Sequence, residues 1–448
     1  MHNTSSESKV TATIIPRSDH PLSRKLISEN ALKVLRRLYR HGYTAYLAGG
    51  GVRDILLGRE PKDFDVVTSA TPEEIKALFR NAFLIGRRFR IAHIRFKGEI
   101  IEVSTFRALR ENDGSDVSQA AETEGVTDDE IESASEAEER KEKKPLEGRE
   151  HSDEGMILRD NVWGKPEEDA FRRDFTVNAL FYDIADFSII DYVGGLEDLK
   201  EGRLRLIGEP EVRYREDPVR MLRAIRFAAK LGFNIDKESL DPMVVLKNDI
   251  LNANSSRLYE ELQKLWISEE AEQGYQLMRK TGLFQVLFPE VDQWLSNEDD
   301  NFPHTFLGRA FEWIEEELRS GRAISPALLY AIVLSGPINE KAVALQEKSG
   351  SRLPVIFKAV KDVVTDFQER ISMPRRDVEV LKTILYGEQR FPQTRGKRPY
   401  VWARNPHFRD AFRYYKMKKN IEGNGDDIVA WWEKFLESED VEKAPEKR

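Results

Sequence analysis

The sequence predicts an α+β protein in which a small mixed-sheet head precedes a long, all-α remainder. Strand-like and helix-like patterns alternate up to about residue 190, which is typical of a mixed sheet with covering helices. Beyond about residue 210, the apolar residues recur with a helical period in almost every segment. The length of 448 residues allows two or three domains, and shares of 40% apolar and 33% charged residues are typical of a soluble globular chain.

The head is predicted as alternating short helices and strands, each bounded by glycine or by a capping residue. Gly42 ends the first helix, the run Gly49-Gly50-Gly51 breaks the first strand, and Thr71 is the N-cap of a later helix. In chain order, the predicted segments are a helix over 27–41, a strand over 44–48, a helix over 52–57, a strand around 64–67, a helix over 72–80 and strands near 91–97 and 99–105. The long helical stretches of the remainder are predicted at 217–231, 256–280, 306–319 and 353–371.

Charge is distributed unevenly along the chain. Residues 113–154 hold sixteen Asp or Glu against five Lys or Arg, a net charge of −11, whereas the whole chain carries −9. Few large apolar residues interrupt this run, so we predict a disordered acidic insertion in the head. Residues 371–420 hold thirteen Lys or Arg and four Asp or Glu, interleaved with aromatic residues. This mixture suits a nucleic-acid backbone with stacked bases, and the alternative is a helical bundle with a basic solvent face.

Several classes of function are excluded by residues that the sequence lacks. The chain has no cysteine, which excludes disulfides, thiolate zinc sites and cysteine nucleophiles. The seven histidines are scattered, and no Walker-type phosphate loop is present. The N-terminal stretch has no signal-peptide pattern, and no run reaches ~18 uninterrupted apolar residues, so neither export nor a membrane span is predicted.

The first candidate site combines a glycine-rich turn with two nearby acids. Asp63 and Asp65 are two residues apart around a predicted strand, so their side chains point to one face and can reach one divalent ion or bridge two. Gly49 and Gly50 leave backbone N–H groups free at a helix start, where phosphates bind, and Arg53 adds a charged donor one turn later. Each half alone is weak evidence, but together they predict a phosphate and metal site.

Two further groups add charged residues to the head. Glu102 lies on a mostly apolar strand, where an acid requires pairing or a metal; the alternative is an edge-strand residue that faces solvent. The run Arg172-Arg173-Asp174 places two guanidinium groups beside a carboxylate. Such a group suits phosphate and ribose binding, but it also suits a structural ion pair.

A fourth group lies at the start of the first long helix. Pro218 in the first turn makes Asp217 a natural N-cap, and Asp217 can pair with Arg220 along the helix. Alternatively, Asp217 as acceptor and Arg220 as donor match the edge of a nucleotide base. Arg223 and Arg226 follow on the same flank, where they are available to phosphates.

Taken in order, these motifs resemble those of the class II tRNA nucleotidyltransferase and bacterial poly(A) polymerase family. The matching residues are Gly49-Gly50 with Arg53, Asp63-Phe64-Asp65, Arg172-Arg173-Asp174-Phe175-Thr176 and Glu216-Asp217-Pro218-Val219-Arg220. The segment 84–94, Leu-Ile-Gly-Arg-Arg-Phe-Arg-Ile-Ala-His-Ile, resembles the one that marks the poly(A) polymerase branch. The resemblance is specific from about Ile14 to Gly232 and continues more loosely to Trp432.

The resemblance implies a nucleotidyltransferase head followed by a helical neck, body and tail. It implies a template-independent poly(A) polymerase, which adds AMP from ATP to RNA 3′ ends and releases pyrophosphate. Asp63 and Asp65 are then expected to bind Mg²⁺, Asp174 to complete the catalytic acids, and Glu102 to lie beside the metal. The expected nucleotide-binding residues are Gly49, Gly50, Arg53, Arg107 and Arg173 at the phosphates or sugar, Asp217 and Arg220 at adenine, and Arg223.

The resemblance and the charge pattern together predict the domain order. A flexible leader over 1–26 precedes the head over 27–190, which contains the insertion at 113–154. A helical neck over 191–275 for base and RNA binding, a body and tail over 276–436 and a disordered C-terminus over 437–448 follow. The resemblance implies a long basic C-terminal extension, whereas the sequence runs from Glu437 to Arg448 without such a pattern. We therefore expect the segment 371–420 to grip RNA, with Arg395, Lys397 and Arg398 as RNA contacts.

The expected partners are RNA 3′ ends, ATP and the RNA-decay machinery, and we expect a cytoplasmic monomer that promotes RNA processing and decay. Two alternatives stay open. CCA addition to tRNA shares the head motifs, and only the segment 84–94 favours the polymerase. A catalytically idle RNA-binding protein is the other alternative, but the intact acids Asp63, Asp65 and Asp174 argue against it, because carboxylates repel phosphate.

Overall fold

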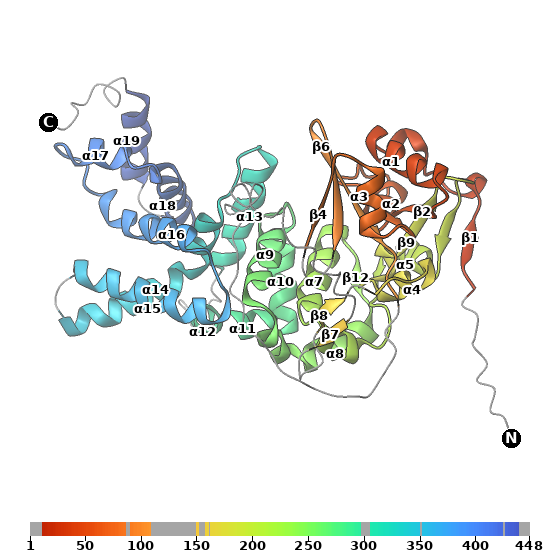
Figure 1. Cartoon of the computed structure of the whole chain (residues 1–448). Helices are drawn as coiled ribbons and strands as arrows, with labels where there is room; N and C mark the ends of the chain where they lie inside the picture. Colours follow the sequence, from red (N-terminus) through yellow and green to blue (C-terminus); the bar gives the residue numbers. More distant parts are fainter. Residues whose placement is uncertain are drawn as a thin grey trace, which may run out of the picture. The chain divides into compact units, whose positions relative to one another are not determined.

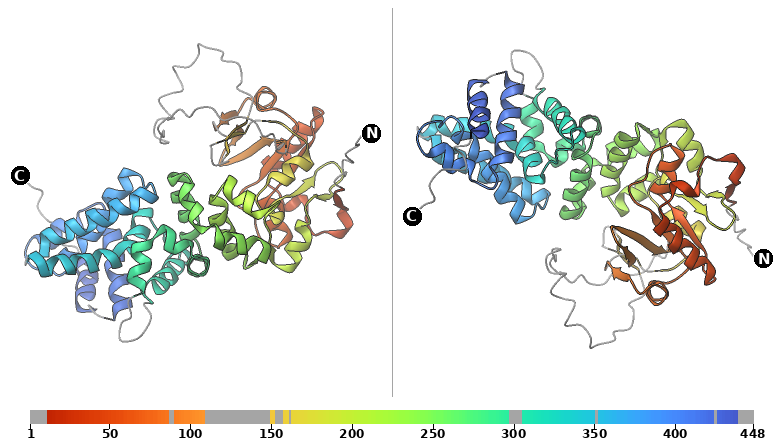
Figure 2. Two further views of the ribbon diagram at one scale, coloured as in Figure 1. Left: turned by 90° about the horizontal axis from the view of Figure 1, so that it is seen from below. Right: turned by 90° about the horizontal axis from the view of Figure 1, so that it is seen from above.

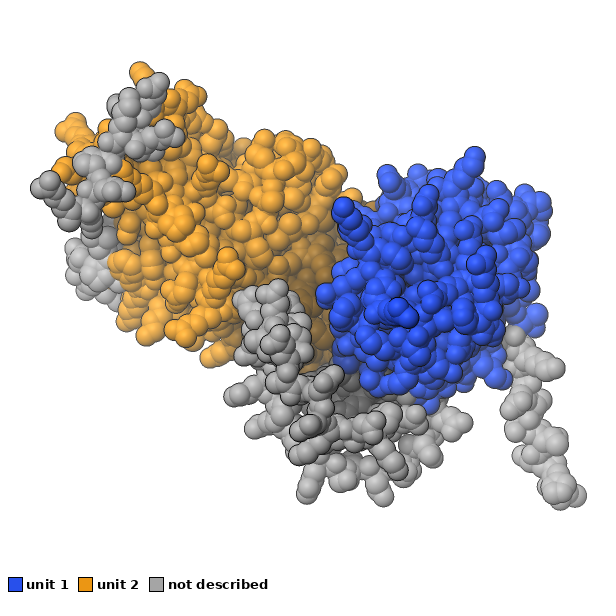
Figure 3. Space-filling model, turned by 45° about the horizontal axis from the view of Figure 1, so that its top comes forward, with its two compact units in different colours: residues 1–217 blue, residues 218–448 orange. Residues whose placement is uncertain are grey.

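Two compact units make up the chain in this computed structural model, Met1–Asp217 and Pro218–Arg448 (Figure 3). The structure describes residues 11–86, 90–108, 149–151, 157–160, 162–296, 305–349, 352–423 and 426–438. Figure 1 shows strands and short helices in the first unit and helices almost throughout the second. This confirms the predicted α+β class with a mixed-sheet head and a helical remainder.

The first unit is built on one eight-stranded sheet, within the described residues, in the order β1-β10-β9-β2-β3-β6-β5-β4. The pair β3–β6 is parallel, and the recorded pairings of the other strands are antiparallel. The strands are β1 (Thr13–Ile15), β2 (Ala45–Ala48), β3 (Asp65–Thr68), β4 (Ala82–Ile85), β5 (Ile91–Phe96), β6 (Glu99–Thr105), β9 (Leu180–Asp183) and β10 (Ile189–Asp191). A separate hairpin joins β7 (Arg149–His151) and β8 (Ile157–Asp160), and β11 (Arg203–Leu204) follows.

The first and third helices of this unit begin at side-chain caps, of which Thr71 is the one that the sequence indicates. Ser28 accepts a hydrogen bond from the Ala31 N–H at the first helix, and Thr71 with Glu74 forms a capping box around Pro72. The helices are α1 (Glu29–Arg40), α2 (Gly50–Leu56), α3 (Pro72–Leu78), α4 (Pro166–Arg172), α5 (Gly195–Glu201) and α6 (Pro210–Glu216), with short 3₁₀ turns η1 (Arg17–Asp19), η2 (Arg24–Leu26) and η4 (Thr176–Asn178). The predicted segments between 27 and 105 therefore exist, with ends that differ by a few residues.

The sheet carries two packed layers. α1 contacts β2, β3 and β6, and α3 contacts β4 and β5. A buried apolar cluster joins Ala48, Val67 and Phe181 to Ala170 of α4. Alternate residues of a strand share one face, so Asp65 lies on the same face as Val67, beside this cluster. The cluster involves β2, β3, β9 and β10, and it positions the acid at its border.

After β6 the chain leaves the sheet, and a bridge joins the two ends of the stretch that follows. Arg107 forms an isolated β-bridge with Trp163, and the Ala108 N–H donates to the Val162 carbonyl over 3.0 Å. The predicted acidic insertion at 113–154 lies outside the described residues except for the short strand β7. Residues 1–10 of the predicted leader and 439–448 of the predicted C-terminus also lie outside them.

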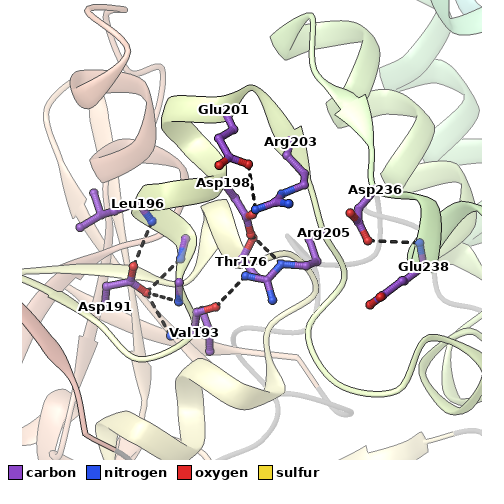
Figure 4. A network of polar contacts seen from close by, with 12 residues as sticks. Thr176, Asp191, Val193, Leu196, Asp198, Glu201, Arg203, Arg205, Asp236 and Glu238 are labelled. Carbon is purple, nitrogen blue, oxygen red and sulfur yellow. Dashed lines mark hydrogen bonds and ion pairs between the residues drawn. The ribbon is translucent and has the colours of Figure 1, made fainter.

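A buried polar network ties residues 191–205 to the first unit (Figure 4). Asp198 of α5 has no exposed surface, and its carboxylate accepts hydrogen bonds from Thr176 Oγ1 at 2.6 Å, Arg203 Nε at 2.6 Å and Arg205 Nε at 2.9 Å. Asp191 accepts four backbone N–H groups from residues 193–196 at the start of α5. The first unit accordingly extends to Asp217, whereas the sequence-based division ended the head at residue 190.

The second unit is a stack of helices, of which α14 and α15 lie side by side (Figure 2). The helices are α7 (Val219–Leu231), α8 (Lys237–Val245), α9 (Ser255–Trp266), α10 (Ala271–Thr281), α11 (Leu283–Leu287), α12 (Pro289–Leu295), α13 (Phe306–Arg319), α14 (Pro326–Ser349), α15 (Arg352–Arg370), α16 (Arg375–Gly387), α17 (Arg398–Ala403), α18 (Phe408–Glu422) and α19 (Asp426–Glu437), with β12 (Asn234–Ile235), η5 (Lys247–Asn252) and η6 (Glu388–Arg390).

The prediction of one helix over 256–280 is wrong, because this segment forms α9 and α10. α9 ends at Trp266, and the Ser268 hydroxyl then donates to the Leu265 carbonyl over 2.7 Å. α10 packs back on α9, and a Cβ at Gly274 would lie 2.5 Å from Leu265 Cδ1. The missing side chain at this position allows the close crossing of the two helices. The predicted helices at 217–231, 306–319 and 353–371 correspond to α7, α13 and α15.

Among the described residues, one helix is long and apolar enough, by length and composition alone, to cross a membrane. It is the stretch Pro326–Glu347 of α14, with a mean hydropathy of 1.3, and 61% of its apolar window is buried. α14 contacts α12, α15, α16 and α18. These contacts are those of a core helix, so its apolar composition is explained by burial inside the unit.

Candidate active site

The predicted acids Asp65 and Glu102 lie side by side on adjacent strands. The parallel pair β3–β6 has the register that places Asp65 opposite Glu102. Glu102 is also opposite His93 of β5, whose Nε2 lies 3.2 Å from Glu102 Oε1. β6 lies inside the sheet, so the alternative interpretation of Glu102 as an edge-strand residue is wrong, although 51% of its side chain is exposed.

The surroundings of Asp65 disfavour its negative charge. Burial, the largest effect, and repulsion from Glu102 and Asp63 raise the pKa of Asp65 to about 6, while Arg173 acts in the opposite direction. Three carboxylates and one guanidinium therefore interact at this point of the sheet. Several carboxylates placed this close together are typical of a functional site, because their mutual repulsion must be compensated by a bound cation or a proton.

Asp63 lies in the loop before β3, and it is exposed. The expectation that Asp63 and Asp65 both lie on the strand is therefore wrong. The β2–β3 ladder ends at the pair Ala48–Asp65, because Gly49 turns the chain with a φ of +68°, a conformation that favours glycine. The pairing of β3 with β2 therefore does not extend to Phe64 or Asp63.

The predicted glycine turn lies directly against the Asp63 loop. α2 begins at Gly50, immediately after the Gly49 turn, and the Gly49 N–H donates to the Leu180 carbonyl over 3.1 Å. A Cβ at Gly51 would lie 3.3 Å from the Asp63 carbonyl oxygen. The start of α2 thus fixes the position of the exposed acid.

Asp174 lies in a tightly held turn between α4 and η4. Its Oδ1 accepts hydrogen bonds from the Phe175 N–H at 2.8 Å and from Asn178 Nδ2 at 3.3 Å. Its carbonyl accepts from the Ile207 N–H at 2.9 Å. The carboxylate is half-buried, and its orientation is set by its own turn and by Asn178.

Arg53 is buried beneath this region. Its side chain is 3% exposed, Nε donates to Asp54 Oδ1 over 2.8 Å, and Nη1 donates to Asn178 Oδ1. Arg53 therefore links α2 to the same asparagine that holds Asp174. Sequence reasoning did not single out Asn178, although it lies only four residues after Asp174 in the same motif.

The predicted phosphate contacts Arg173 and Arg107 gather around Asp169 of α4. Arg173 Nε and Nη2 each lie 3.1 Å from Asp169 Oδ2, and its Nη1 donates to the Asn178 carbonyl over 3.2 Å. The Arg107 N–H donates to Asp169 Oδ1 over 3.3 Å. Burial lowers the pKa of the Arg107 guanidinium; Asp169 opposes this effect and Arg173 adds to it.

Arg213 of α6 is a second residue that sequence reasoning missed. Its Nη2 donates to the carbonyls of Arg172 at 2.7 Å and Arg173 at 2.6 Å, and its Nη1 donates to Glu216 Oε2 over 3.0 Å. The side chains of Arg213 and Glu216 are 12% and 7% exposed. Arg213 thus clamps the end of α4, directly before Asp174, to the helix that leads to Asp217.

The predicted base-reading residues lie at a helix boundary. α7 begins at Val219 with Pro218 as its N-cap, and Asp217 is the C-cap of α6. The prediction of Asp217 as N-cap is therefore off by one position, because α6 occupies the preceding residues. Arg220, in the first turn of α7, is buried with 8% exposure.

Arg223 and Arg226 point toward α9. Arg226 Nε donates to Glu261 Oε2 over 2.9 Å, and Arg223 Nη1 lies 3.6 Å from Glu261 Oε1. Burial acts to raise the pKa of Glu261, but Arg226, Arg223 and Lys264 outweigh it, so the pKa is lowered. The two arginines therefore neutralise a buried acid, in contrast to the open, phosphate-facing flank that the sequence predicted.

The basic segment 371–420 separates into a core and a surface. Five of the eight Phe, Trp and Tyr residues in this segment are buried, namely Phe391, Trp402, Phe408, Tyr414 and Tyr415. Phe391 contacts the rings of Trp402, Phe408 and Tyr415. The prediction that bases stack on these residues is therefore wrong. The alternative, a helical bundle with these residues in its core, describes them correctly. Arg395, Lys397 and Arg398, just before and at the start of α17, are all exposed.

The acids at β3 fit a divalent cation held jointly with a substrate. Within the described residues, no group of three or more His, Asp or Glu side chains is placed to hold a metal on its own. Mg²⁺ usually takes one or two carboxylates and completes its shell with water and substrate phosphates, so the pair Asp63 and Asp65 suffices. The raised pKa of Asp65 shows an unfavourable charge that such an ion would relieve.

Comparisons with known proteins agree with this geometry. Residues 45–205 match the model "Poly A polymerase head domain", 232–295 match "Probable RNA and SrmB- binding site of polymerase A", and 349–447 match "Polymerase A arginine-rich C-terminus". Poly(A) polymerase I of Salmonella typhimurium is 41% identical over 95% of this chain and 86% of its own length. The CCA-adding enzyme of Bacillus pumilus is 31% identical over 62% of this chain and 60% of its own length. A tRNA nucleotidyltransferase solved with a primer tRNA and an incoming ATP analog has a TM-score of 0.56 at 22% identity, over 90% of this chain and 98% of that chain.

The sheet with its acids, the glycine turn and the helical second unit define a nucleotidyltransferase. The similarity to tRNA-processing structures supports the same fold. Within that class, the 41% identity over 95% of the chain shows that the chain belongs to the bacterial poly(A) polymerase family and is a polynucleotide adenylyltransferase.

Proposed function

We propose that the protein extends RNA 3′ ends with AMP taken from ATP, without a template. The supporting observation is the acid group Asp63, Asp65 and Glu102 within a head that matches the poly(A) polymerase model over 45–205. In each cycle the RNA 3′-hydroxyl oxygen bonds to the α-phosphorus of ATP. The bond between that phosphorus and the α–β bridging oxygen breaks, the hydroxyl proton is lost, and pyrophosphate leaves.

Asp63 and Asp65 are the proposed holders of a divalent cation, with Mg²⁺ as the proposed ion. When bound, this ion supplies charge stabilisation at the α-phosphate and at the attacking and leaving oxygens. Glu102 lies opposite Asp65 and adds to the negative field that retains the ion. Asp174, held by Asn178, is the further proposed catalytic acid.

The cations around α4 are the proposed triphosphate contacts. Arg173 forms an ion pair with Asp169, and the Arg107 guanidinium interacts electrostatically with the same carboxylate. The Gly50 N–H at the start of α2 is a further proposed contact, whereas the Gly49 N–H already donates to the Leu180 carbonyl, against the expectation that it is free. Arg53 is proposed to act by holding Asn178 in place, since its guanidinium is buried against Asp54.

The residues at the end of the first unit and the start of the second are the proposed readers of the base. Asp217 offers an acceptor and Arg220 a donor, the combination that matches an adenine edge. Arg223 is proposed to support this helix through Glu261. The exposed Arg395, Lys397 and Arg398 are the proposed contacts to RNA phosphates.

A nucleotide-choice assay tests the proposal. The purified protein is incubated with Mg²⁺ and either labelled RNA with a generic 3′ end or tRNA without its CCA end, with ATP or CTP offered separately. We expect long ATP-dependent extension of the generic RNA, which Asp63→Ala abolishes. Addition that stops after a few nucleotides, needs CTP and prefers tRNA would contradict the proposal and indicate CCA addition.

The cellular setting is a further part of the proposal. Relatives similar over nearly the whole chain, such as poly(A) polymerase I of Salmonella typhimurium, are bacterial proteins, and the apolar helix α14 is explained by core packing. We therefore propose a cytoplasmic monomer that acts on RNA 3′ ends during RNA processing and decay, in contact with the decay machinery.

A further inference from the structure

We propose that the exposed face of β4 and β5 is a docking strip for the backbone of the RNA strand that enters the active site. The strip consists of Lys76, Phe83, Arg95 and Ile100, and Arg95 binds a phosphate within the last few nucleotides of the RNA 3′ end. This inference rests on the proposed function, because it assigns the path of that reaction's RNA substrate.

The strip is continuous with the catalytic acids through the strand register. Phe83 of β4 is opposite His93 of β5, His93 is opposite Glu102 of β6, and Glu102 is opposite Asp65 of β3. Residues directly opposite each other on neighbouring strands point to the same face. One row across four strands therefore leads from an exposed aromatic ring to the acid with the raised pKa.

Arg95 lies on this face, on the side of the row nearer to Asp63. It is two residues after His93 on β5, and it is opposite Ile100 of β6. Because β6 runs parallel to β3, Ile100 lies toward the start of β3, where the chain enters the strand from the loop that holds Asp63. Strand spacing of about 4.8 Å and a rise of about 3.3 Å per residue place the Arg95 backbone roughly 12 Å from Asp65. This span corresponds to a short piece of RNA chain.

The cations of the strip are held in place without being neutralised. Arg95 Cζ lies 4.5 Å from the centre of the Phe83 ring, and Lys76 Nζ lies 5.1 Å from it. Lys76 Nζ also donates to the Ala82 carbonyl. In the part of the chain that the structure describes, neither cation forms an ion pair with a carboxylate. An aromatic ring orients a guanidinium but leaves its N–H donors available to an anion.

The apolar residues beside these cations are also exposed. Phe83 and Ile100 retain 45% and 48% of their surface, which is unusual for large side chains on a sheet. A strand of RNA offers both kinds of contact that the strip provides, since its phosphates are anionic and its sugars and bases have apolar faces.

RNA is the better occupant than ATP because of where the other cations lie. Arg173 lies over the ring of Phe181 on β9, with 5.2 Å between its Cζ and the ring centre. In the sheet order, β9 lies on one side of β3 and β5 lies on the other. Phosphoryl transfer places the attacking and leaving oxygens roughly in line on opposite sides of the phosphorus. The triphosphate at Arg173 and the RNA at Arg95 would approach Asp65 from these two sides.

The chain also offers a matched control for the strip. Arg24 of η2 lies over the Phe187 ring at 4.4 Å, nearly the geometry of the Arg95–Phe83 pair. Phe187 is in the β9–β10 turn, in the opposite half of the sheet from β4. Arg24→Ala therefore removes an exposed cation of the same kind, away from the strip.

The test measures steady-state adenylation by the full-length protein with a short single-stranded RNA primer and ATP. We expect Arg95→Ala to raise the KM for RNA about fivefold to tenfold, with kcat and the KM for ATP unchanged, and Arg24→Ala to change none of these values. Arg95→Lys, which keeps the charge, should recover part of the loss. An unchanged KM for RNA in an active Arg95→Ala protein, or a rise in the KM for ATP instead, would overturn the inference.

A second measurement uses a set of primers, each with a single uncharged methylphosphonate linkage, placed in turn at each of the last four positions. At the linkage that Arg95 contacts, the neutral primer should weaken the wild type and abolish the difference between wild type and Arg95→Ala. Equal effects of the variant on all primers would show that no single phosphate is bound there, against the inference. If the wild type extends none of the charged primers, the proposed function itself fails, and the inference falls with it.

Discussion

Asp65 and Glu102 face each other across the parallel strands β3 and β6, so the register of this pair brings together two acids from separate segments. Their repulsion, the burial of Asp65 and the nearby Asp63 together raise the pKa of Asp65 to about 6. A parallel pairing requires a crossover between the strands, and α3 to β5 form it here. The acid pair is therefore a property of the fold of the whole head.

Asp65→Asn should abolish adenylation and separate catalysis from stability. We expect at least about a 1000-fold loss of kcat, because a ligand to the cation is lost. The metal-free variant should melt at the same temperature as the wild type or above it, since a repelled carboxylate is removed. Added Mg²⁺ with an unreactive ATP analogue should raise the melting temperature of the wild type only. Glu197→Gln, on the exposed surface of α5, is the control for a lost charge.

Arg213→Ala should lower kcat about tenfold to a hundredfold by releasing the turn before Asp174. It should also cost about 2–4 kcal/mol of unfolding free energy, because Glu216 is left buried without the recorded Arg213 contact. Arg215→Ala removes an exposed neighbour on the same helix and should change neither quantity appreciably. Normal turnover by a folded Arg213→Ala protein would show that the clamp does not position the catalytic turn.

Glu261→Gln should destabilise the protein in a pH-dependent manner. Arg226, Arg223 and Lys264 hold the folded pKa of Glu261 below its ordinary value of 4.5, despite burial. The carboxylate therefore contributes stability above about pH 4.5, and this contribution is lost as the pH falls through the lowered folded pKa. Denaturant titrations should show a deficit on the order of 2 kcal/mol at pH 7 that shrinks at pH 4 and below. A deficit independent of pH would point to lost packing instead.

Neutralising Arg395, Lys397 and Arg398 together should weaken RNA binding and flatten its salt dependence. Three lost phosphate contacts to a single strand reduce the slope of log K against log salt by roughly two units. The charge-retaining variant Arg395→Lys/Lys397→Arg/Arg398→Lys should keep the slope of the wild type. Filter binding over a salt series distinguishes the two variants, and an unchanged slope in the neutral variant would contradict the assignment.

Local signals explain why most elements could be predicted. Thr71 caps a helix at the position expected, and Gly49 ends a strand where the glycine run indicated a break. Asp65 and Glu102 were each identified as candidates from their types and spacing. Their pairing could not be predicted, because strand register between distant segments depends on the packing of the whole sheet.

The missed residues have long-range partners. Arg213 contacts carbonyls about forty positions earlier in the chain, and nothing in the local sequence distinguishes it from Arg215. In the segment 371–420, composition gave the correct charge, but it did not tell which helix face each aromatic residue occupies. The burial of Phe391 and Trp402 in the core could therefore not be predicted.

The closure of the chain at Arg107 and Trp163 has a practical consequence. The bridge brings the two ends of the intervening stretch to neighbouring positions, so β6 and α4 are joined irrespective of what the stretch contains. The entropy of closing a loop depends only weakly on its length. A folded reporter domain inserted between residues 113 and 148, before β7, should therefore leave the sheet and its acids intact. The enzyme can accordingly be labelled or tethered through this stretch.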